Sequence, residues 1–414
     1  MDLLCISNGH GEDTIAVQVL KQLRRLPQAP ALAAMPVVGE GGTFQKAGIP
    51  VVGPTQALPS GGFIYMDGRQ AMKDLRGGLL PLTRDQLATV RQWGQKGGHI
   101  LAVGDVVPLA FAWWSGANYS FIGTAKSEYF LRDEQGPRPH RPWFEGWSGS
   151  VYLPWERWLM GHPRCQAVFV RDKLTAEHLR QWQIPARYEG NPMMDGLNAA
   201  TAKLARLSAI APATQPLLTV ALLPGSRAPE AFDNWQLMLR AVDSVRQAFA
   251  DRQIRCLAAI APSLNLSAFK DELVLEEWTP LAGQYPTLSR NNVLLVLTQD
   301  AFAECLHLAD CAIATAGTAT EQMVGLGKPA FTFPGQGPQF TRTFAEVQSR
   351  LLGPSVTLVP DPEAVGAAMQ TCLHDSQRLH QIAENGRHRM GQAGAAGRMA
   401  MVLHKLYSTG ACIG

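Results

Sequence analysis

The sequence predicts an α/β protein with two domains, each built from parallel βαβ units. The chain has 414 residues, which is too long for one compact core and fits two domains of about 200 residues each. Short apolar segments alternate with helix-length segments, as in parallel βαβ units. A polar, Ala-rich stretch ending at residues 212–216 interrupts this alternation, which then restarts. We expect an N-terminal domain over residues 1–205, a C-terminal domain over residues 206–390, and a C-terminal helix over residues 391–414 that packs back on the N-terminal domain.

Composition and charge exclude several classes of protein. Hydrophobic residues make up 46% of the chain and charged residues 17%, which describes a well-buried globular protein and not a disordered one. The net charge of +3 gives no indication of nucleic-acid binding. A mild attraction to anionic lipid is left open, because it depends on whether the charge is clustered.

Cysteine and histidine usage favours the cytoplasm and no structural metal. None of the seven Cys residues forms a CxxC pair, and most lie in apolar runs, as expected of reduced, buried thiols. The His residues lack the spacing of a metal site. The apolar run at residues 3–6 is too short for a signal peptide, and residues 100–114, which contain Asp105 and Pro108, are too short to span a bilayer. We expect a cytoplasmic protein, soluble or peripheral at the inner face of a membrane.

The N-terminal domain begins with a strand, a loop and a helix. Residues 2–7 are typical of a buried strand, residues 8–13 of a glycine-containing loop, and residues 14–26 of an amphipathic helix. The loop follows the carboxyl end of the strand, where open α/β sheets bind ligands. His10 and Glu12 are therefore candidate site residues. A plain turn shaped by the two glycines of the loop explains the same sequence equally well.

A second candidate follows the next part of the domain. The segments expected here are strands at residues 31–38 and 51–52, a helix at 83–96 and a strand at 100–103. Asp105 lies just after the last strand, which is a usual position for a catalytic carboxylate. An Asp at this position also suits the cap of the next helix, expected from Pro108 onward. Both interpretations stay open.

Residues 127–159 differ in character from the rest of the domain. Aromatic side chains are interleaved with basic ones, which suits a surface that contacts lipid head groups or a large amphipathic acceptor. A packed excursion of the first domain is the simpler interpretation, because it would bury most of the aromatic rings. The aromatic residues are Tyr129, Phe130, Trp143, Phe144, Trp147, Tyr152, Trp155 and Trp158, and the basic ones are Arg132, Arg138, His140, Arg141 and Arg157.

The remaining segments repeat the alternation of strands and helices. The first domain closes with a strand at residues 167–171, a helix at 174–182 and a strand from 186 that ends on a Gly/Pro loop. The second domain is expected to contain strands at residues 217–223, 254–260, 293–297, 311–315 and 330–333, and helices at 233–250, 301–309, 363–372 and 376–407, the last with Gly/Ala interruptions at 391–397.

The most informative stretch is residues 311–334. A buried strand is followed by a turn of small residues and by a helix that begins at Gly317. Such a helix start offers unpaired N–H groups and the positive end of the helix dipole, which suits a phosphate. Glu321 in the first turn can accept hydrogen bonds from a ribose, so the combination predicts a nucleotide site. An ordinary capped helix with a favourable acid in its first turn is the alternative.

Two further loops of the second domain fit the same interpretation. Gly225, Ser226 and Arg227 follow the strand at residues 217–223 and can hold a diphosphate through backbone N–H, hydroxyl and guanidinium groups. They also fit a plain turn with a solvated Arg. The loop at residues 335–339 follows a strand as well, and its amides can bond sugar hydroxyls.

Three motifs together resemble a known enzyme family. They are Leu-Leu-Pro-Gly-Ser-Arg at residues 222–227, Thr-Ala-Gly-Thr-Ala-Thr-Glu at 315–321 and Gly-Asn-Pro-Met-Met-Asp at 190–195. The chain is similar to lipid A disaccharide synthase, an inverting sugar-nucleotide glycosyltransferase, and looks most like the lipid A disaccharide synthase-related proteins of cyanobacteria and plastid-bearing lineages. Its second half also resembles the peptidoglycan N-acetylglucosaminyltransferase that makes lipid II. The likeness spans nearly the whole chain but is specific only in the second domain.

The resemblance implies the GT-B fold, with two Rossmann-like domains whose parallel sheets face a central cleft, the donor on the second domain and the acceptor on the first. Asp105 matches a strand end that carries an essential carboxylate in the synthase, and His10 matches the loop histidine of the lipid II enzyme, so both are candidate catalytic bases. The implied donor-binding residues are Gly225, Ser226 and Arg227 for the diphosphate, Gly317, Thr318 and Thr320 for the phosphate-binding helix start, Glu321 for the ribose and Gln339 for the donor sugar. The acceptor-side residues are Asn8, Gly9, Gly11, Glu12 and Asn191.

The expected activity is transfer of a sugar, with inversion, from an NDP-sugar to a lipid-like acceptor, without a cofactor or metal and with UDP as the expected nucleotide. The synthase's first loop is of the Gly-Glu-x-x-Gly-Asp type, whereas residues 7–13 here read Ser-Asn-Gly-His-Gly-Glu-Asp, and the aromatic segment at 127–159 is not the synthase's pattern. The acceptor is therefore left open, and lipid A synthesis is not assigned. A UDP-sugar 2-epimerase, which shares this fold and the donor half, and a non-catalytic protein that binds a nucleotide or lipid are the alternatives.

Overall fold

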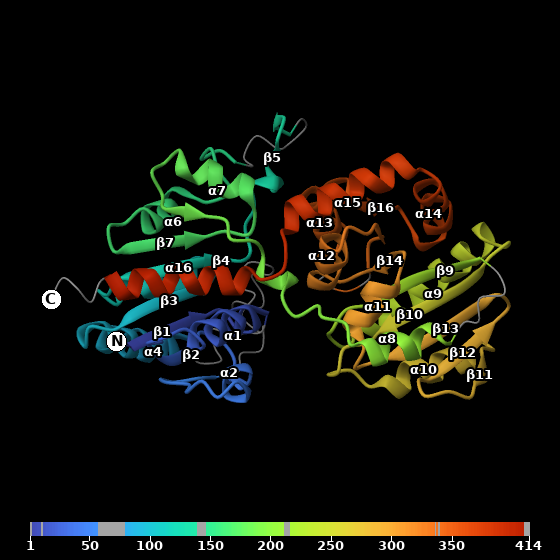
Figure 1. Cartoon of the computed structure of the whole chain (residues 1–414), viewed down its shortest axis with the longest axis horizontal. Helices are drawn as coiled ribbons and strands as arrows, with labels where there is room; N and C mark the ends of the chain where they lie inside the picture. The colour runs from blue at the N-terminus through green and yellow to red at the C-terminus, as the bar shows by residue number, and fades with distance from the viewer. Residues whose placement is uncertain are drawn as a thin grey trace. The chain divides into compact units, whose positions relative to one another are not determined.

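The computed structural model describes residues 2–9, 11–56, 79–138, 146–210, 216–335, 337 and 340–409. The chain divides into two compact units (Figure 1). Unit 1 consists of Met1–Asp195 and Ala393–Gly414, and unit 2 of Gly196–Gln392. The residue at which we placed the boundary, 205, falls inside helix α8 (Thr201–Ser208), whose last carbonyl groups, those of Leu207 and Ser208, accept hydrogen bonds from the buried Arg255 of unit 2.

Unit 1 contains a six-stranded sheet in which all the paired strands are parallel. The strand order is β2-β1-β3-β4-β7-β8. The strands are β1 (Asp2–Ser7), β2 (Ala31–Pro36), β3 (His99–Gly104), β4 (Tyr119–Gly123), β7 (Cys165–Phe169) and β8 (Ala186–Arg187), and a separate two-stranded hairpin consists of β5 (Arg132–Asp133) and β6 (Gly136–Pro137). The parallel βαβ organisation predicted for this part of the chain is confirmed, although β4 was not among the expected strands.

Helices cover both faces of this sheet because successive side chains of a strand point to opposite faces. Leu4 and Ile6 of β1 pack with α4 (Leu79–Gln95), α5 (Val106–Trp114), α6 (Pro154–Met160) and α7 (Lys173–Arg180). Leu3 and Cys5 pack on the other face with α1 (Gly11–Arg24), α2 (Gly42–Lys46) and α16 (Ala395–Thr409). Figure 1 shows α16, in red, lying along the sheet of unit 1.

The start of α16 is held by one carboxylate. Asp195 accepts hydrogen bonds from the backbone N–H groups of Gly394 at 2.5 Å, Ala395 at 3.1 Å and Ala396 at 2.8 Å. These N–H groups have no partner within the helix, and the negative charge is also favoured by the helix dipole. Asp195 is the last residue of the Gly-Asn-Pro-Met-Met-Asp motif. The motif therefore connects the N-terminal segment of unit 1 to its C-terminal helix, α16.

We expect Asp195→Ala to lower the stability of unit 1 by roughly 1–2 kcal/mol, since it removes the charged acceptor of three N–H groups at the start of α16. Asp375→Ala is the matched control, because Asp375 caps α15 (Ser376–Met390) in unit 2 with a bond to the N–H of Arg378. Hydrogen exchange measured by mass spectrometry should show faster exchange of α16 only in Asp195→Ala. Equal exchange of α16 in both variants would contradict the capping role.

Unit 2 contains an eight-stranded sheet with the order β11-β12-β13-β10-β9-β14-β15-β16. Its strands are parallel except at one edge, where β11 and β12 pair antiparallel to their neighbours. The strands are β9 (Leu217–Leu223), β10 (Gln253–Ala259), β11 (Thr279–Leu281), β12 (Thr287–Arg290), β13 (Val293–Thr298), β14 (Cys311–Ala314), β15 (Ala330–Thr332) and β16 (Val356–Leu358). The five strands expected from the sequence are all present.

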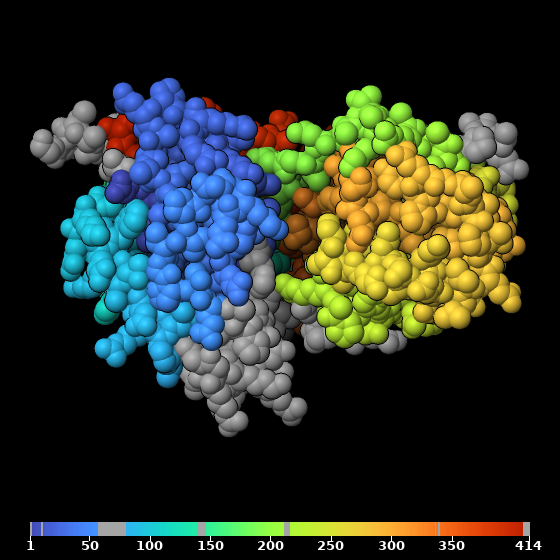
Figure 2. All heavy atoms as spheres, turned by 90° about the horizontal axis from the view of Figure 1, so that it is seen from below, coloured from blue at the N-terminus to red at the C-terminus, as the bar shows by residue number. Residues whose placement is uncertain are grey.

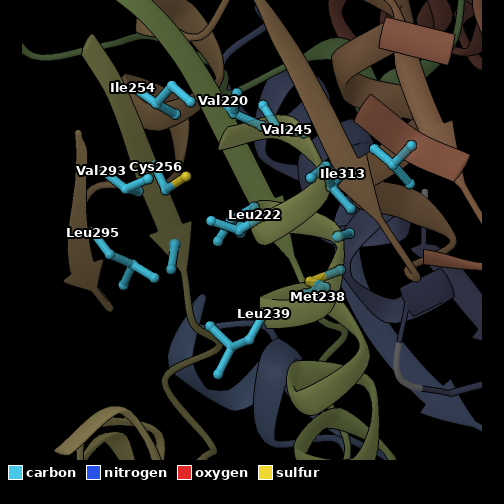
Figure 3. Close-up of a cluster of buried hydrophobic side chains, with 14 of the residues drawn as sticks. Val220, Leu222, Met238, Leu239, Val245, Ile254, Cys256, Val293, Leu295 and Ile313 are labelled. Carbon is cyan, nitrogen blue, oxygen red and sulfur yellow. The ribbon is translucent and has the colours of Figure 1, made fainter. Parts of the chain in front are cut away.

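The larger core of unit 2 lies between its sheet and α9. Figure 3 shows side chains of β9, β10, β13 and β14 packed against Met238, Leu239 and Val245 of α9. Cys305 of α11 and Leu207 of α8 cover the other face. Helix α10 lies at the surface of unit 2 that faces the viewer in Figure 2. The helices of unit 2 introduced here are α9 (Glu230–Ala248), α10 (Leu266–Leu275), α11 (Phe302–Leu308), α12 (Thr318–Gly325), α13 (Arg342–Leu352) and α14 (Val365–Leu373).

The aromatic segment is packed in part and exposed in part. Tyr129 and Tyr152 are buried. The fully buried Glu128 accepts hydrogen bonds from the N–H of Val151 at 2.9 Å and from Nε of Arg132 at 2.8 Å. It therefore joins the beginning of the aromatic segment to its later part. Trp147, Trp155 and Trp158 are exposed. Trp143, Phe144, His140 and Arg141 lie outside the described residues.

Candidate functional site

In unit 1, the carboxyl ends of adjacent strands bring Asn8, Asp105 and Thr124 together. Asn8 follows β1, Asp105 follows β3 and Thr124 follows β4, and these three strands are neighbours in the sheet. The side chain of Asn8 accepts a hydrogen bond from the backbone N–H of Asp105 at 2.9 Å. Gly104 has a φ of +133°, and a Cβ there would lie 1.8 Å from Oδ1 of Asn8. Only glycine permits this close approach, so Asn8 and Gly104 together fix the position of Asp105.

Asp105 is the N-cap of α5. Its Oδ1 accepts a hydrogen bond from the N–H of Val107 at 2.9 Å, so the capping interpretation is confirmed and the helix begins earlier than expected. Capping uses one carboxylate oxygen and leaves the other oxygen without a hydrogen bond among the described residues. The carboxylate is therefore both held in place and able to accept a proton.

Glu12 is in the first turn of α1, close to Asp105. Oγ1 of Thr124 donates a hydrogen bond to Oε1 of Glu12 at 3.3 Å. Burial raises the pKa of Glu12, and the nearby carboxylates of Asp105 and Asp13 raise the pKa further against the lowering effect of its hydrogen bonds. Asp13 itself accepts a hydrogen bond from Oγ of Ser7 at 2.6 Å. Three carboxylates thus lie at this end of the sheet, and such groups are typical of acid–base chemistry.

Arg171 and Asn191 lie close to Thr124 and line a small cavity with it. Nη1 of the buried Arg171 donates to the carbonyl of Thr124 at 3.1 Å. Asn191 is buried too, and its Oδ1 accepts from the N–H of Met193 at 3.0 Å. A cavity of about 10 Å³ between these residues has room for one water molecule and is too small for a sugar. Arg171 therefore holds the residue that follows β4, and Asn191 caps the short helical turn Pro192–Met194.

We expect Glu12→Gln to stabilise the protein at neutral pH. The folded state raises the pKa of Glu12 above its ordinary value of 4.5, so the unfolded chain loses this proton first as pH rises. Stability of the wild type therefore falls with pH through this window, and the variant avoids the loss while keeping an acceptor for Thr124. Melting temperatures of both proteins should agree near pH 4 and diverge toward pH 8, with the variant higher. If the melting temperature of the wild type rises relative to that of the variant as pH increases, the raised pKa of Glu12 is contradicted.

In unit 2, the loops after β9 and β14 adjoin each other. The N–H of Thr315 donates to the carbonyl of Leu223 at 3.1 Å, and its hydroxyl donates to the carbonyl of Pro224 at 3.4 Å. Gly225 has a φ of +109°, and a Cβ at this residue would lie 3.8 Å from the carbonyl oxygen of Thr315. Ser226 and Arg227 are exposed. The structure therefore brings the Gly225 loop beside the turn that precedes α12.

Helix α12 begins as the sequence predicts, with Gly317 as its N-cap and Glu321 in its first turn. Thr318 is exposed at this helix start. The hydroxyl of the buried Thr320 donates to the carbonyl of Ala316 at 2.5 Å, so it is used inside the turn. Glu321 is 8% exposed. The first N–H groups of the helix lie where no intrahelical acceptor reaches them, which is the geometry of an anion site.

Gln348 of α13 positions this turn. Its Nε2 donates to the carbonyls of both Ala316 and Gly317 at 3.1 Å. Holding the two carbonyl groups on one side orients the N–H groups of the turn toward the other side. Gln348 is buried on a helix that the sequence analysis did not predict. A polar residue on the apolar face of an amphipathic segment was the signal that could have identified it.

Glu230 of α9 holds the loop after β15. Its Oε1 accepts a hydrogen bond from the N–H of Phe340 at 2.7 Å, and a Cβ on Gly337 would lie 2.2 Å from the Cγ of Glu230. The N–H of Gly335 donates to the carbonyl of Phe340 at 2.9 Å. Phe340 is thus anchored on the helix that follows the Gly225 loop, whereas residues 336, 338 and 339 lie outside the described residues.

The candidate residues fall into two groups, one in each unit. Asn8, Gly9, Gly11, Glu12, Asp105 and Asn191 lie at the carboxyl ends of the strands of unit 1, and Gly225, Ser226, Arg227, Gly317, Thr318, Thr320 and Glu321 lie at those of unit 2. His10 and Gln339 lie outside the described residues. Sequence reasoning missed Thr124, Arg171, Glu230 and Gln348. Among the described residues, no three His, Cys, Asp or Glu side chains gather in a way that could hold a metal ion.

Comparison with known proteins gives a fold and no sequence family. No family model and no curated protein matches the chain. A putative UDP-N-acetylglucosamine 2-epimerase from Listeria monocytogenes aligns over 99% of this chain and 97% of its own, with 13% identity and a TM-score of 0.57. The UDP-GlcNAc 2-epimerase from Neisseria meningitidis, bound to UDP-GlcNAc, aligns over 98% and 100%, with 13% identity and a TM-score of 0.56. MurG from Acinetobacter baumannii aligns over 98% and 99%, with 12% identity and a TM-score of 0.56.

These similarities establish the fold. The neighbours are GT-B proteins with two Rossmann-like domains, and the chain has this fold, as the resemblance implied. Sequence identities of 12–13% do not show that this chain shares the activity of any of these neighbours. None of the three neighbours is a lipid A disaccharide synthase, so the resemblance to that family stays a prediction.

Proposed function

We propose that the chain is an inverting glycosyltransferase that moves a sugar from an NDP-sugar, with UDP as the expected nucleotide, to a hydroxyl group of a lipid-like acceptor. The observation that carries the proposal is the pair of adjoining loops in unit 2, where the start of α12 lies beside Gly225 and Glu321 is buried in the first turn. This arrangement suits a diphosphate with a ribose beside it. Solved neighbours of the same fold are described as bound to UDP-GlcNAc or UDP, which supports a nucleotide sugar.

In this proposal the donor is held by unit 2. The backbone of Gly225 and the side chains of Ser226 and Arg227 bind the diphosphate, and the N–H groups at Gly317 and Thr318 bind it from the helix side. Glu321 accepts hydrogen bonds from the ribose, and Gln339 contacts the donor sugar. Thr320 acts through Ala316, because its hydroxyl is bonded to that carbonyl. As the sugar leaves, charge on the diphosphate is stabilised by the helix start and Arg227, so the reaction needs neither a metal nor another cofactor.

The acceptor side of the proposal lies in unit 1. Transfer with inversion requires a base that takes the proton of the acceptor hydroxyl as that oxygen attacks the sugar. Asp105 is the proposed base, because Asn8 and Val107 fix its position and one of its oxygens stays without a hydrogen bond among the described residues. His10 is the second candidate for this role. The cytoplasm is the proposed compartment, in keeping with the six described cysteines, which are all buried and free.

A UDP-sugar 2-epimerase is the second candidate function. Two of the three neighbours described above are named UDP-GlcNAc 2-epimerases, and their TM-scores of 0.57 and 0.56 equal or exceed that of MurG. An epimerase would use the same donor site in unit 2 and would need no acceptor. The carboxylates of unit 1 would then move a proton at the sugar instead of at an acceptor hydroxyl.

Product analysis separates the two functions. The protein is incubated with UDP-GlcNAc or UDP-glucose, with and without a total lipid extract in detergent, and the products are identified by mass spectrometry and chromatography. The proposal predicts UDP release and a glycosylated lipid only when lipid is present. Conversion of UDP-GlcNAc to its 2-epimer without lipid would establish the epimerase. Nucleotide binding without either product would favour the non-catalytic alternative.

A further inference from the structure

Unit 1 exposes an unusual number of tryptophans. Among the described residues, five of the ten exposed large hydrophobic side chains are Trp, and all five lie in unit 1. Trp147 is 63% exposed, Trp155 53% and Trp158 55%. Tryptophan is on average a highly buried residue, and clusters of exposed apolar groups mark interaction surfaces. The remaining two are Trp114 and Trp182.

Four of these five tryptophans lie on one layer of the unit. Trp114 ends α5, Trp155 and Trp158 are three residues apart on α6, and Trp182 follows α7. All three helices cover the same face of the sheet. The rings of Trp113 and Trp158 are 5.3 Å apart, which joins α5 to α6. We call this surface, defined by Trp114, Trp155, Trp158 and Trp182, the tryptophan face.

Basic side chains accompany the tryptophan face. Arg157 lies over the ring of Trp182, with 4.2 Å from its Cζ to the ring centroid, and Arg91 lies over Trp114 at 5.8 Å. Helices α6 and α7 each carry one carboxylate, and each carboxylate forms an ion pair with a lysine. Glu156 is buried and paired with Lys126 at 2.5 Å, and Glu177 is paired with Lys173 at 3.6 Å. Outside these two pairs, α6 carries Arg157 and α7 carries Arg180, so these two helices have a net positive charge.

The tryptophan face is distinct from the candidate site. Helix α5 begins at the carboxyl end of β3 and runs back along the sheet, so that Trp114 lies toward the amino ends of the strands. The hydroxyl of Tyr119, the first residue of β4, donates to the carbonyl of Leu159 at 2.6 Å, which places the end of α6 at the same edge. The site residues lie at the opposite edge.

We propose that the tryptophan face docks unit 1 on the head-group region of an anionic membrane. Tryptophan prefers the membrane interface, where its ring is apolar and its N–H meets water, and arginine adds attraction to anionic lipid. No helix among the described residues is long and apolar enough to cross a membrane. The proposed contact is binding at the membrane surface. The proposal is independent of the catalytic function, because it uses none of the site residues.

Vesicle flotation tests the proposal with the full-length protein. Wild type is mixed with vesicles of phosphatidylcholine alone or with about 30% phosphatidylglycerol. We expect flotation with the anionic vesicles, little with the neutral ones, and loss of binding when salt is raised from about 0.1 M to 0.5 M. Trp155→Ser with Trp158→Ser should weaken binding by roughly tenfold or more. Arg157→Gln should weaken it by roughly fivefold.

Leu275→Ser is the matched control. Leu275 is 81% exposed and lies on α10 of unit 2, so its loss should leave flotation unchanged. Because every substituted side chain except Arg157 is exposed, the variants should keep the wild-type melting temperature. Absence of flotation, or flotation that the double Trp variant retains, would overturn the proposal. So would a concentration-dependent dimer, seen by ultracentrifugation, that the double Trp variant loses, since the face would then bind a second copy of the chain.

Discussion

Replacing Asp105 by Asn is expected to lower turnover by roughly 10²-fold or more and to leave nucleotide affinity at the wild-type value. The variant keeps the shape of the side chain, and Asn is as good an N-cap as Asp, so α5 and its bond to the N–H of Val107 should survive. What disappears is the carboxylate that accepts the proton of the acceptor hydroxyl. Steady-state kinetics of UDP release with lipid present, together with calorimetric titration with UDP, measures both quantities.

Asp361→Asn serves as the control for Asp105→Asn. Asp361 also caps a helical turn, through a hydrogen bond from the N–H of Ala364 at 3.0 Å, but it lies in unit 2. Its substitution should change neither turnover nor UDP affinity. If Asp105→Asn turns over at the wild-type rate, Asp105 is only a cap, and the base must be sought at His10 or Glu12.

Glu321→Gln and Glu321→Ala are expected to weaken UDP binding by roughly 10- to 100-fold, the range for a hydrogen bond to a charged group. If Glu321 binds the ribose, 2′-deoxy-UDP should bind the wild type more weakly than UDP does. The Glu321→Ala variant should then show a smaller difference between the two nucleotides, because the partner of the missing hydroxyl is already gone. Calorimetric titration of both proteins with both nucleotides completes the cycle.

Two outcomes would argue against a ribose contact. Equal losses for UDP and 2′-deoxy-UDP in Glu321→Ala would mean that Glu321 supports the turn without touching the 2′-hydroxyl. Unchanged affinity for both would remove Glu321 from the nucleotide site. Melting temperatures of the unliganded variants are the control, because Glu321 is buried and its loss also has a structural cost.

The fold could be predicted where the signals are local. Strand β9 has the bounds expected from its apolar run, and α12 begins at Thr318, directly after the expected start at Gly317. A short buried strand and a small turn are both visible in consecutive residues. Strand β4 was missed. Its five residues, with Ser120 at the centre, are a weak local signal, and their burial is decided by β3 and β7 on either side.

The candidate site could be predicted only in part, since much of it depends on distant contacts. Asp105 was visible as an acid after a strand, but its fixation by Asn8, 97 residues earlier, required the strand order. Gln348 supports the turn at Ala316 from 32 residues away, on a helix that was not among the expected elements. Thr124 follows β4, which was missed, and so its bond to Glu12 was missed as well.

The measurement that tests the central claim most directly is the melting temperature of the wild-type protein in UDP, GDP, ADP and TDP. A nucleotide at a hundred times its dissociation constant adds about 2.7 kcal/mol to the stability of the folded state. The account predicts that UDP raises the melting temperature and that the effect is lost in Glu321→Ala. If none of the four nucleotides shifts the wild-type protein, the start of α12 is only a capped helix, and the proposed donor site is contradicted.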